Sequence, residues 1–445
     1  MSKRIFALLI ALFVLVPAGF ALTASAEESV NLRFAYWGSG AEKEGVDVAI
    51  TEFEKANPNI KVERLHIPDD FVTKLNAMIA ANEAPDVCYS GPWKIQLGKD
   101  GLIYNYYEIA ELDPSISADD VADYCWWKWS ETESAGPYQA SVCPSLMYNV
   151  DLFNEAGVEL PPTKAEDAWT WDEFVEVAQR LTFDRSGRNA LDPAFDPEDI
   201  QQYGIQMSTG WNGWYPFVLS NGGKYLTEDG TAFGLNSPEA TEALQKVADL
   251  INVYHVHPTP AASSTLPGTA TALQTRRVAI SIQGSWTHAD LALTEDFNWG
   301  VGVLPIHKEY KSFFHGGSLV IFKSTKSLES ALKLHNWIIN PANVIELHKG
   351  LWVPQLNSWY TDPEKIALWA EEGTPGRPIG FQDAVMKSTF EHAEPSPENC
   401  VVNFAEIDAL VWPALDNVWN GSMTAQEAMD SIADPVNALV AGWIY

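Results

Sequence analysis

Several tryptophans of this 445-residue chain stand where an indole ring could stack on a ligand rather than fill a core. Trp37 follows a predicted strand in a turn with Gly38 and Ser39, and Trp286 ends a Gln-Gly-Ser-Trp turn after another strand. A core-facing Trp would more often lie within a strand. The C–H face of a sugar ring stacks on such flat surfaces, and its hydroxyls bond to carboxylates and amides. We therefore predict both rings in a sugar-binding site.

A compact aromatic cluster follows between Gly210 and Gly223, in a stretch that we predict as a loop. Loops held by a rigid scaffold often carry functional residues. The alternative is that two of the three aromatic rings only fill the core. The cluster that we predict to contact the ligand consists of Trp211, Asn212, Trp214 and Tyr215.

Each remaining candidate for ligand binding also has a structural interpretation. Glu42 could accept hydrogen bonds from hydroxyls, or only stabilise the start of a helix. Trp93 could stack on the ligand or pack on the following helix. Gly316 and Gly317 would let the backbone approach a ligand closely. The set is completed by Ser90, Trp352 and Phe404.

Oxygen-bearing side chains also gather in the loop from Asp184 to Asp196, which contains Ser186, Asn189 and Asp192. Calcium prefers oxygen ligands, but this spacing fits no defined calcium loop. We therefore predict no metal site and no cofactor.

The four cysteines allow three full disulfide pairings, and the sequence does not choose among them. They are Cys88, Cys125, Cys143 and Cys400, of which Cys125 and Cys143 form the most local pair. No CxxC pattern or His/Cys cluster indicates zinc.

Catalytic motifs are missing from the sequence. Gly-x-Ser-x-Gly does not occur, and no cysteine lies in a recognisable catalytic motif. A secreted glycoside hydrolase is the enzymatic alternative, because acidic residues are plentiful and that chemistry needs two carboxylates about 5 to 10 Å apart. No acidic pair lies among the aromatic candidates, so we predict a binding protein without catalytic residues.

The elements that must position these side chains alternate between strand and helix. Hydrophobic periodicity predicts a strand at 30–36, a helix at 42–56, a strand at 60–67, a helix at 71–81 and a strand at 86–89. This order favours a right-handed α/β layer. Later strands are predicted at 138–148, 279–282, 299–304 and 319–322, and helices at 151–156, from Thr170 onward, at 237–254 and at 327–339, with the remainder mostly helical.

The N-terminus has the pattern of a secretory signal. Lys3 and Arg4 precede an apolar run, and Ala24-Ser25-Ala26 supplies the small residues of a cleavage site before Glu27. We predict that residues 1–26 are removed and that the mature protein is free in the periplasm. The formal net charge of −31 argues against nucleic acid and anionic lipid as partners.

Several phrases, in order along the chain, resemble the extracellular solute-binding proteins of carbohydrate ABC transporters, the maltose-binding-protein-like group. The most specific phrase runs from Leu146 to Gly157 (LMYNVDLFNEAG) and continues with Pro161-Pro162 and the TWDEF stretch at 170–174. The others are the strand 32–40, the APDV stretch at 84–87, the stretch 210–223, the turn 283–286 and the Gly-Gly-Ser stretch at 316–318. At 89–93 the chain departs from this group, because an aromatic residue stands where the group often has a polar ligand contact.

The resemblance implies a two-lobed periplasmic-binding-protein fold of type II, with a ligand cleft between α/β lobes and a hinge of crossing strands. The expected N-terminal lobe is 27–136 plus 312–360, and the expected C-terminal lobe is 137–311 plus 361–445. The implied function is capture of a sugar or oligosaccharide by a monomer that delivers it to permease subunits in the inner membrane. The same fold binding glycerol phosphate or a polyamine is the alternative, although the candidate loops are poor in bases, which favours a neutral sugar.

Overall fold

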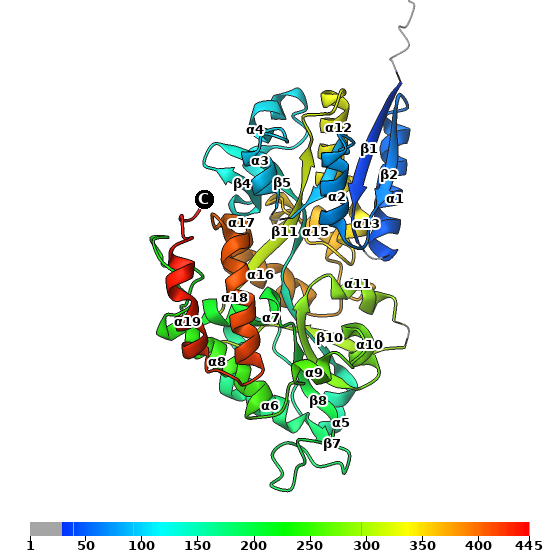
Figure 1. Cartoon of the computed structure of the whole chain (residues 1–445). Coiled ribbons are helices and arrows are strands. Elements are labelled where there is room, and N and C mark those ends of the chain that lie inside the picture. The colour runs from blue at the N-terminus through cyan, green and yellow to red at the C-terminus, as the bar shows by residue number, and fades with distance from the viewer. Residues whose placement is uncertain (1–28, 39, 92, 295, 445) are drawn as a thin grey trace, which may run out of the picture.

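The chain folds into two α/β lobes, each built on its own β-sheet (Figure 1). The computed structural model describes residues 29 to 444 except 39, 92 and 295, so the predicted signal at 1–26 lies outside the described residues. The expected two-lobed α/β class is confirmed. Within the part that the structure describes, no helix has the length and apolar character needed to cross a bilayer.

The first sheet has seven strands, in the order β2-β1-β3-β11-β5-β4 with β12 beside β11. β1 pairs in parallel with β2 and β3, as the strand–helix–strand pattern predicts, whereas β11 runs antiparallel to β3 and β5. The strands are β1 Val30–Tyr36, β2 Ile60–His66, β3 Val87–Ser90, β4 Trp126–Ser130, β5 Glu133–Val142, β11 Ser312–Ile321 and β12 Ala393–Pro395.

Helices cover this sheet because each presents an apolar face to it. In α1 the buried residues Val46, Ile50 and Phe53 recur at helical spacing, which confirms the predicted helix, although it begins at Gly40. The helices of this lobe are α1 Gly40–Ala56, α2 Phe71–Ala80, α3 Lys94–Lys99, α4 Tyr106–Ile109, α12 Leu328–Ile339 and α13 Ile345–His348.

The second sheet has five strands, in the order β10-β6-β9-β8-β7. They are β6 Pro144–Asn149, β7 Phe183–Asp184, β8 Ile200–Met207, β9 Val278–Gly284 and β10 Trp299–Gly302. The helices of this lobe are α5 Val150–Ala156, α6 Trp171–Arg180, α7 Trp211–Ser220, α8 Pro238–Asn252, α9 Pro260–Ser263, α10 Thr269–Gln274, α11 Thr287–Ala292, α18 Phe404–Trp419 and α19 Ala425–Asn437.

The helix predicted from Thr170 onward is confirmed as α6, and a capping box begins it. The Thr170 hydroxyl accepts from the Glu173 amide at 3.3 Å, and the Glu173 carboxylate accepts from the Thr170 amide at 2.8 Å. The Ser237 hydroxyl likewise caps α8 by accepting from the Ala240 amide.

The prediction of a loop between Gly210 and Gly223 is wrong, because most of this stretch forms the helix α7. This helix is buried nearly all round, so its sequence shows no amphipathic period. Gly213 does not break it. A Cβ atom there would overlap the Ser208 carbonyl, so glycine allows the helix to pack directly on the preceding backbone.

The single strand predicted at 138–148 is also wrong, because it is two strands of two different sheets. β5 stays in the first sheet up to Val142, and β6 enters the second at Pro144. The lobe boundary at 136/137 stays a prediction. In the structure β5 continues to pair within the first sheet up to Val142, so the chain first passes between the sheets at Cys143.

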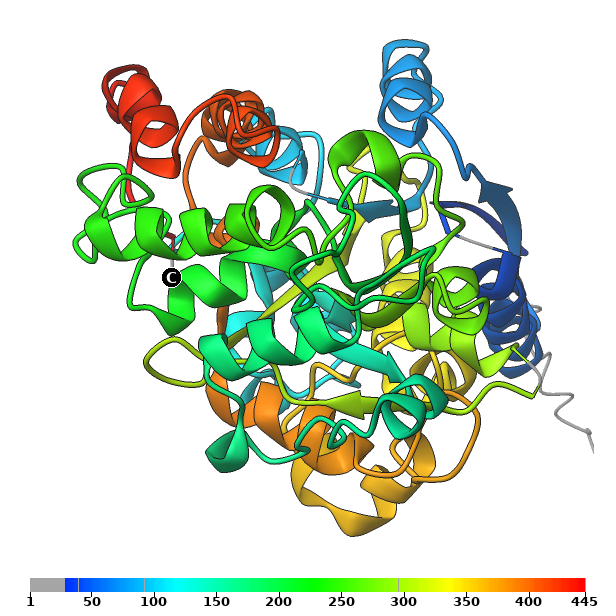
Figure 2. The same ribbon diagram turned by 90° about the horizontal axis from the view of Figure 1, so that it is seen from below.

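The chain returns to the first sheet between β10 and β11, and crosses again after β12 towards the C-terminal helices. The helices α14 Ser358–Thr361, α15 Pro363–Trp369 and α16 Ser388–His392 precede β12, and this last passage runs through α17 Pro397–Cys400. α18 and α19 then pack on α8 of the second lobe, at one edge of the molecule in Figure 2. Three crossings make a hinge of the kind that the resemblance implies.

All four cysteines are buried free thiols, so the most local pair, Cys125 and Cys143, does not form a disulfide. Burial raises the pKa of Cys125 to about 12, which suppresses the reactive thiolate.

Hydrogen bonds organise the Asp184 loop. The Asp184 carboxylate accepts from the Ser186 and Arg188 amides at 2.8 and 3.0 Å and pairs with the Arg188 guanidinium. Among the described residues, no group of three or more His, Cys, Asp or Glu side chains is arranged to hold a metal ion.

Candidate functional site

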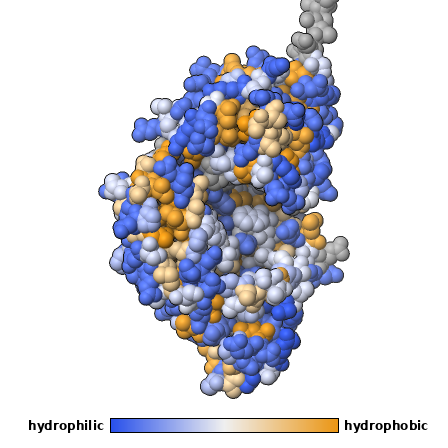
Figure 3. Space-filling model, in the orientation of Figure 1, coloured by the Kyte–Doolittle hydropathy of each residue, from blue (hydrophilic) through white to orange (hydrophobic). Residues whose placement is uncertain are grey.

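A cavity of about 440 Å³ opens between the two lobes, where the surface is hollowed in Figure 3. Segments far apart in the sequence meet there: the ends of β1, β3 and β9, the middle of β5 and β11, and α17. The lining residues are Trp37, Glu42, Gly91, Trp93, Gln139, Val142, Trp286, His315, Gly316, Gly317, Leu351, Trp352 and Glu398. We call this cavity the cleft.

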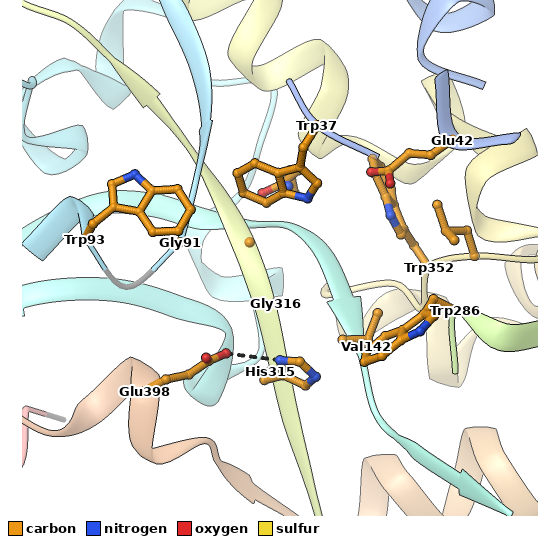
Figure 4. Close-up of a pocket in the computed structure, with 13 residues that line it drawn as sticks. Trp37, Glu42, Gly91, Trp93, Val142, Trp286, His315, Gly316, Trp352 and Glu398 are labelled. Atoms are coloured by element: carbon orange, nitrogen blue, oxygen red, sulfur yellow. Dashed lines mark hydrogen bonds and ion pairs between the residues drawn. The ribbon is translucent and has the colours of Figure 1, made fainter. Parts of the chain in front are cut away.

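Four indole rings surround the cleft (Figure 4). Trp37 lies at the end of β1 and is held on edge by three aromatic neighbours, Phe71, Tyr89 and Trp93, with ring centroids 5.0, 5.1 and 5.7 Å away. Trp286 faces them from the second lobe, and Trp352 is 2% exposed. Such rings present fixed flat surfaces to a ligand at little cost in conformational entropy.

Two of these indoles are placed by the same local device, one in each lobe. Trp93 follows β3 and lies over the backbone of Gly91, and Trp286 follows β9 and lies over Gly284. A Cβ atom at either glycine would overlap the indole ring. Glycine at these two positions is therefore what allows the rings to lie flat at the ends of the strands.

Carboxylates supply the acidic part of the cleft wall. Glu42, in the first turn of α1, folds back over Gly38, whose φ of +123° suits glycine. Burial raises the pKa of Glu42 to about 8, so its carboxyl group holds a proton at neutral pH. The described lining residues include no Lys or Arg.

A hydrogen-bonded chain joins three segments at the floor of the cleft. His315 Nδ1 lies 3.0 Å from Glu398 Oε1, and His315 Nε2 lies 3.3 Å from the Asn212 side-chain nitrogen. A neutral imidazole satisfies both contacts when Nδ1 donates to the carboxylate and Nε2 accepts from the amide. The chain links α7 of the second lobe to β11 and α17.

Gln139 adds an amide to the floor. Its side chain is 1% exposed and lies against Gly317, where a Cβ atom would be 2.7 Å from its Nε2. Its Oε1 has no hydrogen-bond partner, and buried polar atoms are rarely left unpaired. Gln139 thus places an unpaired acceptor beside the cleft.

The structure brings seven of the predicted ligand residues together. These are Trp37, Glu42, Trp93, Trp286, Gly316, Gly317 and Trp352. Gly38 supports Glu42 from outside the lining, whereas Ser39 lies outside the described residues. Ser90 is fully buried at the end of β3.

The other predicted residues do not line the cleft. Trp214, Tyr215 and Phe404 are each at most 5% exposed, and Trp211 packs among them and Tyr225. Asn212 reaches the cleft only through its contact with His315. A direct role of this cluster in ligand binding stays a prediction.

Sequence reasoning missed the other residues that line the cleft, which are Gly91, Gln139, Val142, His315, Leu351 and Glu398. His315 directly precedes the Gly-Gly pair, and that neighbourhood was an available signal. Glu398 gave none, because α17 reaches the cleft only through the last crossing of the chain.

Two lobes, a hinge of crossing strands and an interlobe cleft with aromatic walls define a ligand-binding protein of the periplasmic-binding class. Residues 48 to 372 match the bacterial extracellular solute-binding protein family, so the chain belongs to that family. The prediction of a binding protein rather than an enzyme is confirmed by this membership.

Known relatives cover almost the whole chain. The sn-glycerol-3-phosphate-binding periplasmic protein of Pectobacterium atrosepticum is 23% identical over 94% of this chain and 93% of its own length. An ABC substrate-binding protein of Listeria monocytogenes in complex with cycloalternan superimposes with a TM-score of 0.77 at 22% identity, covering 92% of this chain and 99% of that one. UgpB of Mycobacterium tuberculosis in complex with glycerophosphocholine gives a TM-score of 0.71 at 17% identity, covering 91% and 97%.

Proposed function

We propose that this protein is the exported carbohydrate-binding component of an ABC importer. The observation that carries the proposal is the cleft, in which indoles from both lobes face each other and the polar groups are carboxylates, an amide and a histidine. Stacking on Trp37, Trp93 and Trp286 suits the C–H faces of a sugar. The cycloalternan complex of the Listeria neighbour, a carbohydrate complex on the same fold, supports this class of ligand.

In this proposal, capture and delivery follow from the hinge. The sugar first stacks on Trp37 and Trp93 of the first lobe, and rotation about the three crossings brings Trp286 of the second lobe onto it. Closure excludes water and strengthens the hydrogen bonds to the polar groups of the floor. The permease in the inner membrane then recognises the closed shape in the periplasm.

A glycerol phosphate is the second candidate, because the curated relatives are named for glycerol 3-phosphate. A phosphate is usually bound by Arg, Lys or free backbone amides. Two buried bases lie near the hinge, but both donate to backbone carbonyls: Lys94 to Gly91, and Arg377 to Trp369, Gly376 and His348. With no Lys or Arg among the described lining residues, the cleft favours a sugar over a phosphate ester.

A thermal-shift screen tests the proposal. A ligand that binds only the folded state stabilises it by about 2.7 kcal/mol at a concentration of 100 Kd. We expect stabilisation by a mono- or oligosaccharide and none by glycerol 3-phosphate. Stabilisation by glycerol 3-phosphate alone would establish the second candidate, and release of smaller sugars from a stabilising oligosaccharide would contradict a binding protein.

A further inference from the structure

The charge of the cleft is of one sign. Among the described lining residues, the acidic side chains are Glu42 and Glu398, and the only other ionisable side chain is His315. The hydrogen bonds of His315 are satisfied when its imidazole is neutral. Glu398 is 17% exposed on its side chain, so it is screened from water on most sides. A carboxylate in such surroundings is stabilised by a nearby positive charge.

Lys94, on which the charge of Glu398 acts, does not supply that positive charge. Lys94 lies behind Gly91, where its amino group donates to the Gly91 carbonyl at 2.9 Å and rests against the Trp127 ring. Its side chain is 1% exposed, and burial lowers its pKa well below the usual range, although the charge of Glu398 acts in the opposite direction. A buried lysine of this kind favours the neutral amine.

The unused hydrogen-bonding capacity of the floor also points to a ligand that donates. Gln139 Oε1 is a buried acceptor without a partner, and Glu398 Oε1 is the acceptor in its contact with His315 Nδ1. Carboxylate and amide oxygens can each accept more than one hydrogen bond. An ammonium group brings three donors and no acceptor.

The indole faces complete the argument. A cation close to the face of a Trp ring is attracted by the ring quadrupole, and the attraction grows when water is excluded. Trp37 and Trp93 meet at 61° with centroids 5.7 Å apart, so they form two adjoining walls rather than one flat stack. Walls at an angle, with the carboxyl groups of Glu42 and Glu398 in the same cleft, suit a compact cation as well as a sugar face.

We infer that the ligand is a cationic carbohydrate, an amino sugar or amino-oligosaccharide whose protonated amine lies among the indoles and pairs with Glu398. The inference rests on the proposed function and narrows its substrate class. In this inference the sugar rings stack on the indoles, and the ammonium group binds to the acidic floor of the cleft.

Matched pairs of sugars that differ only by amine and hydroxyl test the inference. The probes are glucosamine and glucose, galactosamine and galactose, and the β-1,4-linked glucosamine disaccharide and cellobiose, titrated calorimetrically at pH 7. In any pair of which a member binds, we expect the amino sugar to bind roughly tenfold more tightly than its hydroxyl counterpart, or more. Binding of the hydroxyl member with equal or higher affinity, or stabilisation by neutral sugars alone in a wider screen, overturns the inference and leaves the proposed function standing.

Charge-removing variants locate the amine. Glu398→Gln keeps the shape and an acceptor for His315 but removes the charge, and we expect it to lower the affinity for the amino sugar roughly tenfold. Glu44→Gln is the matched control, because Glu44 is exposed on α1 and does not line the cleft. Equal affinity of Glu398→Gln and Glu44→Gln would show that the amine does not pair with Glu398. If no amine binds while glycerol 3-phosphate does, both the inference and the proposed function fail.

The proton balance of binding gives an independent readout. A bound cation favours the ionised form of Glu42, whose carboxyl is protonated in the empty cleft. At a pH low enough that the free amino sugar is already fully protonated, binding should therefore release protons. The titratable neighbours Tyr36 and Tyr89 do not contribute, because burial raises both pKa values. Calorimetry in two buffers of different ionisation enthalpy measures the sign, and proton uptake with every amine would contradict the inference.

Discussion

At the scale of single residues, the structure separates two tryptophans that the sequence treats alike. Trp286 lines the cleft, whereas Trp211 packs among Trp214, Tyr215 and Phe404. We expect Trp286→Ala to weaken ligand binding by about 1 to 3 kcal/mol through lost stacking, with little effect on folding. We expect Trp211→Ala to lower the free energy of unfolding by about 3 kcal/mol or more. Calorimetry measures the affinity and urea denaturation the stability. Loss of stability in Trp286→Ala and loss of affinity in Trp211→Ala would contradict the site.

Glu42 should make stability depend on pH. The unfolded carboxyl loses its proton near 4.5, whereas the folded one keeps it up to about 8. Between these values the folded state binds more protons than the unfolded state, so the Glu42 contribution to stability falls as the pH rises through this window. We expect the loss of unfolding free energy from pH 5 to pH 9 to be smaller in Glu42→Gln than in the unaltered protein. Identical pH profiles from urea denaturation would show that Glu42 is not buried as described.

At the scale of elements, the two Gly-x-Trp turns should be as important as the rings that they carry. A Cβ atom at Gly284 would overlap the Trp286 indole, so Gly284→Ala must displace the ring from the cleft wall. We expect this variant to lose ligand affinity nearly as strongly as Trp286→Ala. Gly268→Ala is the control, because a Cβ atom there meets nothing within 4 Å. Full affinity in Gly284→Ala, measured by the same titration, would contradict the role of the turn.

The sequence predicted best those elements whose periodicity is simple. The bounds of β1 are those predicted, α1 and α8 carry amphipathic patterns, and α8 also has a recognisable Ser237 cap. Prediction failed where burial on all sides removes the period, as in α7, and where one residue, Cys143, separates strands of different sheets. In the cleft, aromatic residues at strand ends were predictable. Glu398 was not, because its position depends on three crossings of the chain.

At the scale of the whole molecule, ligand binding should change the shape. Crossing segments join the two sheets at the hinge, and a ligand held by Trp37 and Trp286 would draw the lobes together. We expect the radius of gyration from small-angle X-ray scattering to decrease when a saturating ligand is added. At the same ligand saturation, the lobes of the Trp286→Ala variant should close less completely, so its radius of gyration should decrease less. An unchanged radius with bound ligand would contradict capture by closure.

A crystal structure with the sugar identified by screening is the most direct test of the account. The account predicts the sugar in the interlobe cleft, with Trp37 or Trp93 on one side, Trp286 on the other, and its polar groups within hydrogen-bonding distance of Gln139 or Glu398. A sugar bound outside this cleft, or a cleft that stays empty at saturating ligand, would contradict it.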